Sequence, residues 1–82
     1  MPSRLRRLAA REVLAALHTF GFEVVATRGS HAKLRRRGPA GETQVLTAPL
    51  HKELALGTVR AFYRQACRFV PEERLRPLFF HE

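Results

Sequence analysis

The sequence predicts an α+β fold in which three antiparallel strands form a sheet and helices pack on one of its faces. Two observations predict this class. Apolar residues recur at helical spacing near both ends of the chain, and three short segments of strand character lie between them. Such elements bury their apolar sides against each other in layers. With 82 residues and no repeat or linker, residues 1–82 are expected to form one domain.

The first helix is predicted over residues 9–20. Apolar side chains recur there at the spacing of one helix face, at Ala9, Val13, Leu17 and Phe20. Gly21 follows and is expected to end the helix, because glycine tolerates the left-handed conformation.

Three strands are predicted next, over residues 22–27, 30–37 and 43–48. The first is short and rich in β-branched residues. Residues 38–41 read Gly-Pro-Ala-Gly, which is typical of a turn, and Pro49 is expected to end the third strand.

The second strand carries the clearest alternation. Ala32 and Leu34 point to one side, whereas His31, Lys33 and Arg35 point to the other. This strand is therefore expected to have one half-buried face and one basic face.

A second helix is predicted over residues 59–68, with Thr58 as its N-cap. Residues 51–56 fit either a loop or a partial helical turn. One side of the helix pattern is apolar, with Val59, Phe62, Tyr63, Ala66 and Val70. The other side has arginines at i, i+4 and i+8, namely Arg60, Arg64 and Arg68.

A short C-terminal helix is expected to begin at Pro71 and to end at Pro77, followed by an apolar tail at Phe79-Phe80 that packs on the core or on a partner. The resulting order, α-β-β-β-α with a short last helix, is shared by double-stranded-RNA-binding domains. Element order alone says little about function.

The charge balance favours nucleic acid as the partner. Fifteen basic against seven acidic residues give a net charge of +8, and only Lys33 and Lys52 of the basic residues are lysine. Arginine matches phosphate geometry and stacks on bases. An acidic protein or a membrane surface also fits such a charge, and a mere compositional bias is the remaining interpretation.

The sequence further predicts a soluble cytoplasmic protein without a metal or other cofactor. No segment approaches the ~20 apolar residues that span a bilayer, and the N-terminus lacks the apolar region of a secretory signal. The single cysteine excludes an internal disulfide. All acidic residues are glutamates, scattered except for Glu72 and Glu73, so they do not form the oxygen cluster that two-metal chemistry needs.

Histidine is therefore the candidate catalytic group. His31 begins the second strand and shares its face with Lys33 and Arg35, and His51 follows the end of the third. If these strands pair as a hairpin, both histidines lie at the same edge of the sheet. His18 is expected to be solvated or to lie at the edge of the core, and no role is predicted for His81.

The chemistry that suits such an edge is RNA cleavage. An imidazole titrates near pH ~6.5 and can take the proton of a ribose 2′-hydroxyl, which lies beside the scissile phosphate. Lys33 and Arg35 can stabilise the charge that develops on the phosphate. The simpler interpretations are a phosphate contact without catalysis for His31 and a solvated face for the helix arginines.

One motif in this region resembles a known family. Residues 29–34, Gly-Ser-His-Ala-Lys-Leu, are similar to the Gly-Ser-His-x-x-aromatic motif of the HicA (YcfA-like) mRNA-interferase toxins. Companion segments occur in the family's order: Gly21-Phe22, Pro49-Leu50-His51, Glu53-Leu54, Gly57-Thr58-Val59-Arg60 and Gln65-Ala66. Together they cover residues 9–76.

The resemblance implies a double-stranded-RNA-binding-domain-like fold, metal-independent mRNA cleavage and a cognate HicB-type antitoxin that covers the active face. The family's catalytic histidine corresponds to His31, and its Pro-x-His element corresponds to His51. The RNA-binding residues are then expected to be Ser30, Lys33, Arg35, His51, Arg60 and Arg64.

The chain also departs from the family pattern. Leu34 stands where the family usually has an aromatic residue, and neither the Arg35-Arg36-Arg37 run nor the Phe79-Phe80 tail belongs to the pattern. A non-catalytic RNA-binding module on the same fold is therefore the alternative, followed by a domain whose basic face docks an acidic protein. Cleavage specificity, oligomeric state and toxin–antitoxin stoichiometry are not predicted.

Overall fold

A computed structural model describes residues 4–81 of the chain. Its elements are β1 (Arg4–Leu5), α1 (Ala10–His18), β2 (Glu23–Arg28), β3 (His31–Arg37), β4 (Thr43–Pro49), α2 (Leu56–Ala66), α3 (Glu72–Phe79) and β5 (Phe80–His81). The predicted α-β-β-β-α order with a short last helix is confirmed, with a short strand added near each end.

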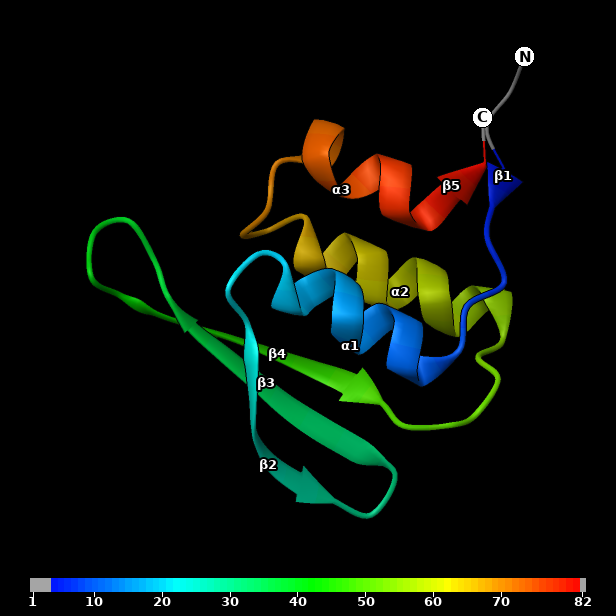
Figure 1. The fold of residues 1–82 in the computed structure, drawn as a ribbon, viewed down its shortest axis with the longest axis horizontal. Helices are drawn as coiled ribbons and strands as arrows, with labels where there is room; N and C mark the ends of the chain where they lie inside the picture. Colours follow the sequence, from blue (N-terminus) through cyan, green and yellow to red (C-terminus); the bar gives the residue numbers. More distant parts are fainter. Residues whose placement is uncertain (1–3, 82) are drawn as a thin grey trace.

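The central sheet has the order β2-β3-β4, and both strand pairs are antiparallel. Figure 1 shows α1 and α2 on one face of this sheet, with α3 and the β1–β5 pair beyond them. The predicted α+β class is thereby confirmed, and within residues 4–81 the opposite face of the sheet carries no helix.

The core lies between the sheet and the helices. From the sheet, Ala32, Leu34, Leu46 and Ala48 are each at most 1% exposed. The predicted apolar side of the second helix faces them and is buried at Val59, Phe62, Tyr63, Ala66 and Val70. The two-residue alternation of β3 and β4 is therefore what separates an apolar face from a solvent face.

The start of α2 differs from the sequence prediction. The helix begins at Leu56 with Ala55 as its N-cap, and among the described residues no side chain forms a capping hydrogen bond to it. The N–H of Val59 donates to the Ala55 carbonyl at 3.0 Å, so the first helical turn closes before Thr58 can act as a cap. The helix also ends at Ala66, which leaves Arg68 beyond it.

The prediction that Pro77 ends the last helix is wrong, because α3 continues to Phe79. Pro77 lacks an N–H, yet the N–H of Phe80 donates to the Arg76 carbonyl and closes the last turn. Phe79 is fully buried, and the centre of its ring lies 5.4 Å from the ring centre of Tyr63 and 6.4 Å from that of Phe62. Packing of Phe79 against α2 therefore outweighs the bond lost at Pro77.

Pairing between the two ends of the described chain was not predicted. Arg4 and Leu5 pair with His81 and Phe80, and the strands lie side by side in Figure 1. The Arg6 N–H donates to the Phe79 carbonyl at 2.8 Å, and its guanidinium donates to the Leu78 carbonyl at 3.0 Å. Two-residue strands have no recognisable sequence pattern, so only the tertiary structure brings them together.

Arg36 occupies the inner row of β3 and has a structural role. Its Nη1 donates to the Phe20 carbonyl at 2.8 Å, and its Nη2 donates to the Phe69 carbonyl at 2.7 Å. Its Nε donates to the buried amide oxygen of Gln44 at 2.6 Å, and the guanidinium lies 4.7 Å from the centre of the Phe22 ring. One side chain thus ties the sheet to the segments that follow α1 and α2.

Replacing Arg36 with Met is expected to lower the free energy of unfolding by about 2–4 kcal/mol, because three acceptors lose a charged donor. Urea denaturation followed by circular dichroism measures this loss. Arg37→Ala is the matched control, since Arg37 is exposed on the opposite face of β3, and its effect should stay within about 0.5 kcal/mol. Equal losses in the two variants would contradict a structural role for Arg36.

Candidate nucleic-acid interface

The helix-free face of the sheet is strongly basic along β3. His31, Lys33, Arg35 and Arg37 are all exposed and alternate with the buried residues of that strand. Their neighbours on β4 are uncharged: Pro49 lies opposite His31, Thr47 opposite Lys33, Val45 opposite Arg35 and Thr43 opposite Arg37. The sequence-predicted basic face is thus present, with His31 at one end of its row.

A tight turn places His31 at the sheet edge. Gly29 and Ser30 connect β2 to β3, and Gly29 has a φ of +56°, which most other residues adopt only with strain. The Ser30 hydroxyl oxygen lies 3.5 Å from Nδ1 of His31, a long distance for a hydrogen bond. The imidazole therefore stands exposed at the turn, with Ser30 beside it.

Arg28 is a candidate residue that the sequence reasoning missed. It pairs directly with His31 across the β2–β3 hairpin, so both side chains emerge on the same face of the sheet. Arg28 is therefore the cationic residue directly opposite His31 in the strand pairing, whereas Lys33 and Arg35 lie further along β3. The two-residue Gly-Ser turn was the signal that pointed to this pairing.

The structure brings the segment of His51 to the same edge as His31. The N–H of Leu50 donates to the Ser30 carbonyl at 2.6 Å, and Pro49 pairs with His31. His51 follows, is exposed, and its carbonyl accepts a hydrogen bond from the Ala10 N–H at 3.3 Å. Its backbone therefore links the turn that carries His31 to the start of α1.

Arg60 and Arg64 lie on a different surface. Together with Arg4 they line an open groove of about 840 Å³ between α2, the β1–β5 pair and α3, with Leu56, Tyr63 and Phe80 among its apolar residues. The predicted RNA-binding residues thus divide between the sheet face and this second groove. Arg68 is not part of the groove, and its guanidinium lies 5.5 Å from the centre of the Phe69 ring.

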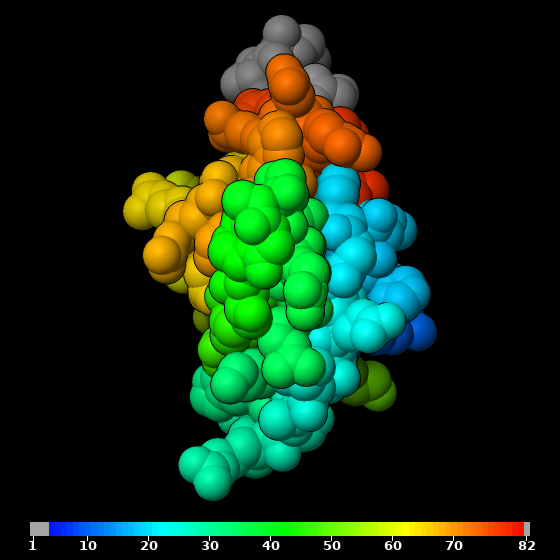
Figure 2. All heavy atoms as spheres, turned by 90° about the vertical axis from the view of Figure 1, so that its left-hand side faces the viewer, coloured from blue at the N-terminus to red at the C-terminus, as the bar shows by residue number. Residues whose placement is uncertain are grey.

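Figure 2 shows the molecule from the side of the β3–β4 hairpin. The hairpin, in green, crosses the middle of this face, α3 lies above it in orange, and the residues near position 30 form the lower end. Within residues 4–81, no three His, Cys, Asp or Glu side chains group as metal ligands, and every helix is too short or too polar to cross a bilayer.

Comparison with known protein families identifies the family of the domain that contains this sheet edge. A family model described as the HicA toxin of bacterial toxin–antitoxin systems matches residues 10–66, from the start of α1 to the end of α2. The chain belongs to the HicA toxin family. No curated protein matches it significantly. The matched segment contains the whole sheet, so the basic face and His31 are part of the family domain, and the family assigns the chain a toxin role.

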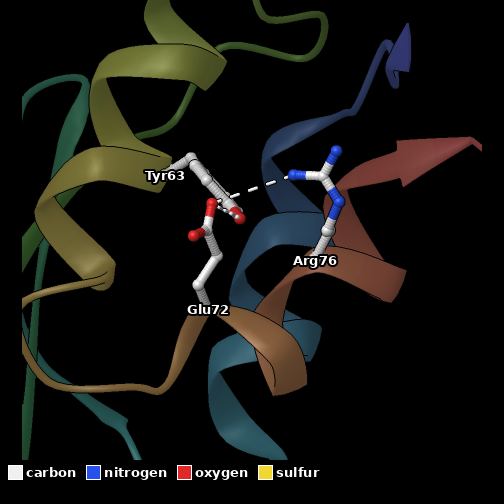
Figure 3. Close-up of polar contacts among 3 residues, drawn as sticks. All are labelled: Tyr63, Glu72 and Arg76. Carbon is white, nitrogen blue, oxygen red and sulfur yellow. Dashed lines mark hydrogen bonds and ion pairs between the residues drawn. The ribbon is translucent and has the colours of Figure 1, made fainter. Parts of the chain in front are cut away.

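In this HicA-family chain, helix α3 follows the matched segment. A buried tyrosine of the matched segment, Tyr63, joins the two. The Tyr63 hydroxyl on α2 donates to Glu72 of α3 at 2.9 Å, and Arg76 lies 3.8 Å from the same carboxylate oxygen (Figure 3). Burial and the bond to Glu72 raise the pKa of Tyr63 to about 12. Burial also raises the pKa of the neighbouring Cys67 thiol, which makes this cysteine a poor nucleophile.

Tyr63 should therefore ionise near pH 12 in the folded protein and near its ordinary pH of about 10 in denaturant. The fold favours the neutral phenol, so its contribution to stability is complete below pH 10 and is lost as the pH rises toward 12. Ultraviolet absorbance of tyrosinate measures this directly, since Tyr63 is the single tyrosine and the chain has no tryptophan.

Glu72→Gln serves as the control for the cause of this shift. It removes the negative charge but leaves the ring buried, so ionisation should move to lower pH and still stay above the denatured value. An identical titration in folded and denatured protein would contradict the packing of Tyr63 between α2 and α3.

Proposed function

We propose that this protein is the toxin of a toxin–antitoxin pair and acts in the cytoplasm as an endoribonuclease that cleaves mRNA, with residues 1–82 as one domain. His31 is the general acid or base, and no metal takes part. The observation that carries this proposal is the exposed imidazole of His31 at the end of a basic strand row, beside Arg28, in a chain of the HicA family.

The reaction follows from the chemistry of RNA. His31 takes the proton of the 2′-hydroxyl, the 2′ oxygen attacks the neighbouring phosphorus to form a 2′,3′-cyclic phosphate, and the bond to the 5′ oxygen breaks as that oxygen takes up a proton from water. Arg28, Lys33 and Arg35 stabilise the negative charge on the phosphate during this exchange. DNA lacks the attacking hydroxyl and is bound without cleavage by this route.

RNA binding involves both basic surfaces in this proposal. Ser30 and His51 hold the strand near the scissile bond, because their segments meet at the sheet edge, and Lys33 and Arg35 hold it further along β3. Arg60 and Arg64 contact phosphates further along the RNA from the groove beside α2. A HicB-type antitoxin would then inhibit the toxin by covering the helix-free face and neutralising its charge.

A non-catalytic RNA-binding module is the second candidate. One observation favours it: within residues 4–81, the only side-chain hydrogen-bond contact of His31 is the long one to Ser30. A general base is normally oriented by a firmer partner. The two candidates agree on binding and differ in whether cleavage products form.

Replacing His31 with Ala should reduce RNA cleavage by about 10²–10⁴-fold, the usual contribution of a general acid or base. RNA affinity should remain within a few-fold of the parent. The measurement is gel analysis of mixed RNA incubated with purified protein in chelator, alongside the same RNA with 2′-deoxy sugars, which should stay intact.

His18→Ala is the matched control, because His18 is exposed on α1 and belongs to neither basic surface. Cleavage by the His31 variant at the parental rate would overturn the catalytic assignment. Binding by the parent protein without any cleavage products would establish the non-catalytic module.

Replacing Lys33 and Arg35 together with Ala should weaken binding to all RNA sequences alike. Loss of two phosphate contacts should reduce the slope of log affinity against log salt by about 1.4 for single-stranded RNA. Fluorescence anisotropy over a range of salt concentrations measures the slope. An unchanged slope would mean that RNA does not bind to the helix-free face of the sheet.

A further inference from the structure

A second hollow lies next to the catalytic edge and is not used by the mechanism above. It is a groove of about 590 Å³ between the start of α1 and residues 50–53. Its walls are aliphatic and its rim is charged: the lining residues are Ala9, Ala10, Arg11, Leu14, Leu50, Lys52 and Glu53. Its volume lies within the range of small-ligand sites, about 300–1,000 Å³, and admits one nucleoside.

One backbone hydrogen bond ties this groove to the turn that carries His31, and a second joins its two walls through His51. Leu50, on one wall, donates to the Ser30 carbonyl at 2.6 Å. Ala10, on the other wall, donates to the His51 carbonyl at 3.3 Å. The groove is thus built from the same backbone as the catalytic edge, with the chain at His51 between them.

The charges on the rim match a nucleotide. Arg11 and Lys52 are exposed, and no residue within 4–81 forms an ion pair with either of them or with Glu53. Two cations suit phosphates on either side of a base that lies on the aliphatic walls. The Glu53 carboxylate is an acceptor that suits an amino group on the edge of the base, as carboxylates pair with the N4 amino group of cytosine.

We propose that this groove holds the base of a nucleotide adjacent to the scissile phosphate and that Glu53 selects bases with an exocyclic amino group over uracil. The proposal rests on the RNA-binding function above and adds a source of sequence preference. Uracil is disfavoured because its ring N–H lies between two carbonyl oxygens, which the carboxylate repels. Arg11 and Lys52 supply affinity without sequence preference.

Binding of uncleavable RNA by the full-length protein tests this. The probes are 2′-O-methyl oligonucleotides of cytidine and of uridine, which have the same ring size and differ at the amino position. The parent should bind the cytidine probe about fivefold more tightly, corresponding to the lower end of discrimination by one such contact. Glu53→Ala should bind both probes equally.

Charge on the rim is tested by a matched pair of double variants. Arg11→Ala with Lys52→Ala should weaken binding of both probes and reduce the salt slope by about 1.4. Arg68→Ala with Arg74→Ala removes the same charge from exposed positions outside the groove and should leave the slope within a few tenths of the parent. Equal effects of the two double variants would overturn the proposal.

Nuclear magnetic resonance separates failure of the groove from failure of the function. The amide signals of Ala10, Leu14 and Leu50 should shift on addition of the cytidine probe. Shifts confined to Lys33, Arg35 and their strand neighbours would overturn the proposed base site in the groove, as would equal affinity of the parent for both probes. In either case the proposed function would stand. No RNA binding by the parent at low salt would overturn both.

Discussion

The arrangement of this protein depends on which side chains of β3 face the helices. A strand presents alternate side chains to opposite faces, so a shift of one residue would exchange its two rows. Ala32 and Leu34 hold the inner row by packing, and Arg36 completes it with three hydrogen bonds to Phe20, Gln44 and Phe69. The outer row is then necessarily His31, Lys33, Arg35 and Arg37. The basic face is thus a consequence of how the inner row is anchored.

The histidine edge is assembled from three segments that meet at one end of the sheet. The Gly29–Ser30 turn fixes the pairing of Arg28 with His31, and the bond from Leu50 to Ser30 brings in the chain that follows β4. The bond from Ala10 to His51 then joins the start of α1 to the same edge. The proposed catalytic, phosphate-binding and base sites therefore share one backbone framework, although they use separate side chains.

Additional packing comes from residues outside the matched HicA segment. A chain of this length buries only about 60% of its unfolded surface, so each further contact matters. Phe79 enters the core against Phe62 and Tyr63, and the β1–β5 pair joins the two ends of the described chain. Arg4, Leu5 and Phe80 of this strand pair also line the groove that contains Arg60 and Arg64. Residues outside the matched segment thus contribute to the surface of this groove as well as to the core.

By itself, the sequence determined the element order, the three-stranded sheet, the buried side of α2 and the outward direction of His31, Lys33 and Arg35, because apolar periodicity is a local property of the chain. The inward position of Arg36 was not predicted, and its acceptors at Phe20 and Phe69 lie in other parts of the chain. Only the tertiary structure decided that Arg60 and Arg64 lie apart from the sheet face and that β1 pairs with β5. These relations join residues distant in sequence, and they depend on strand register and helix packing, which no local pattern encodes.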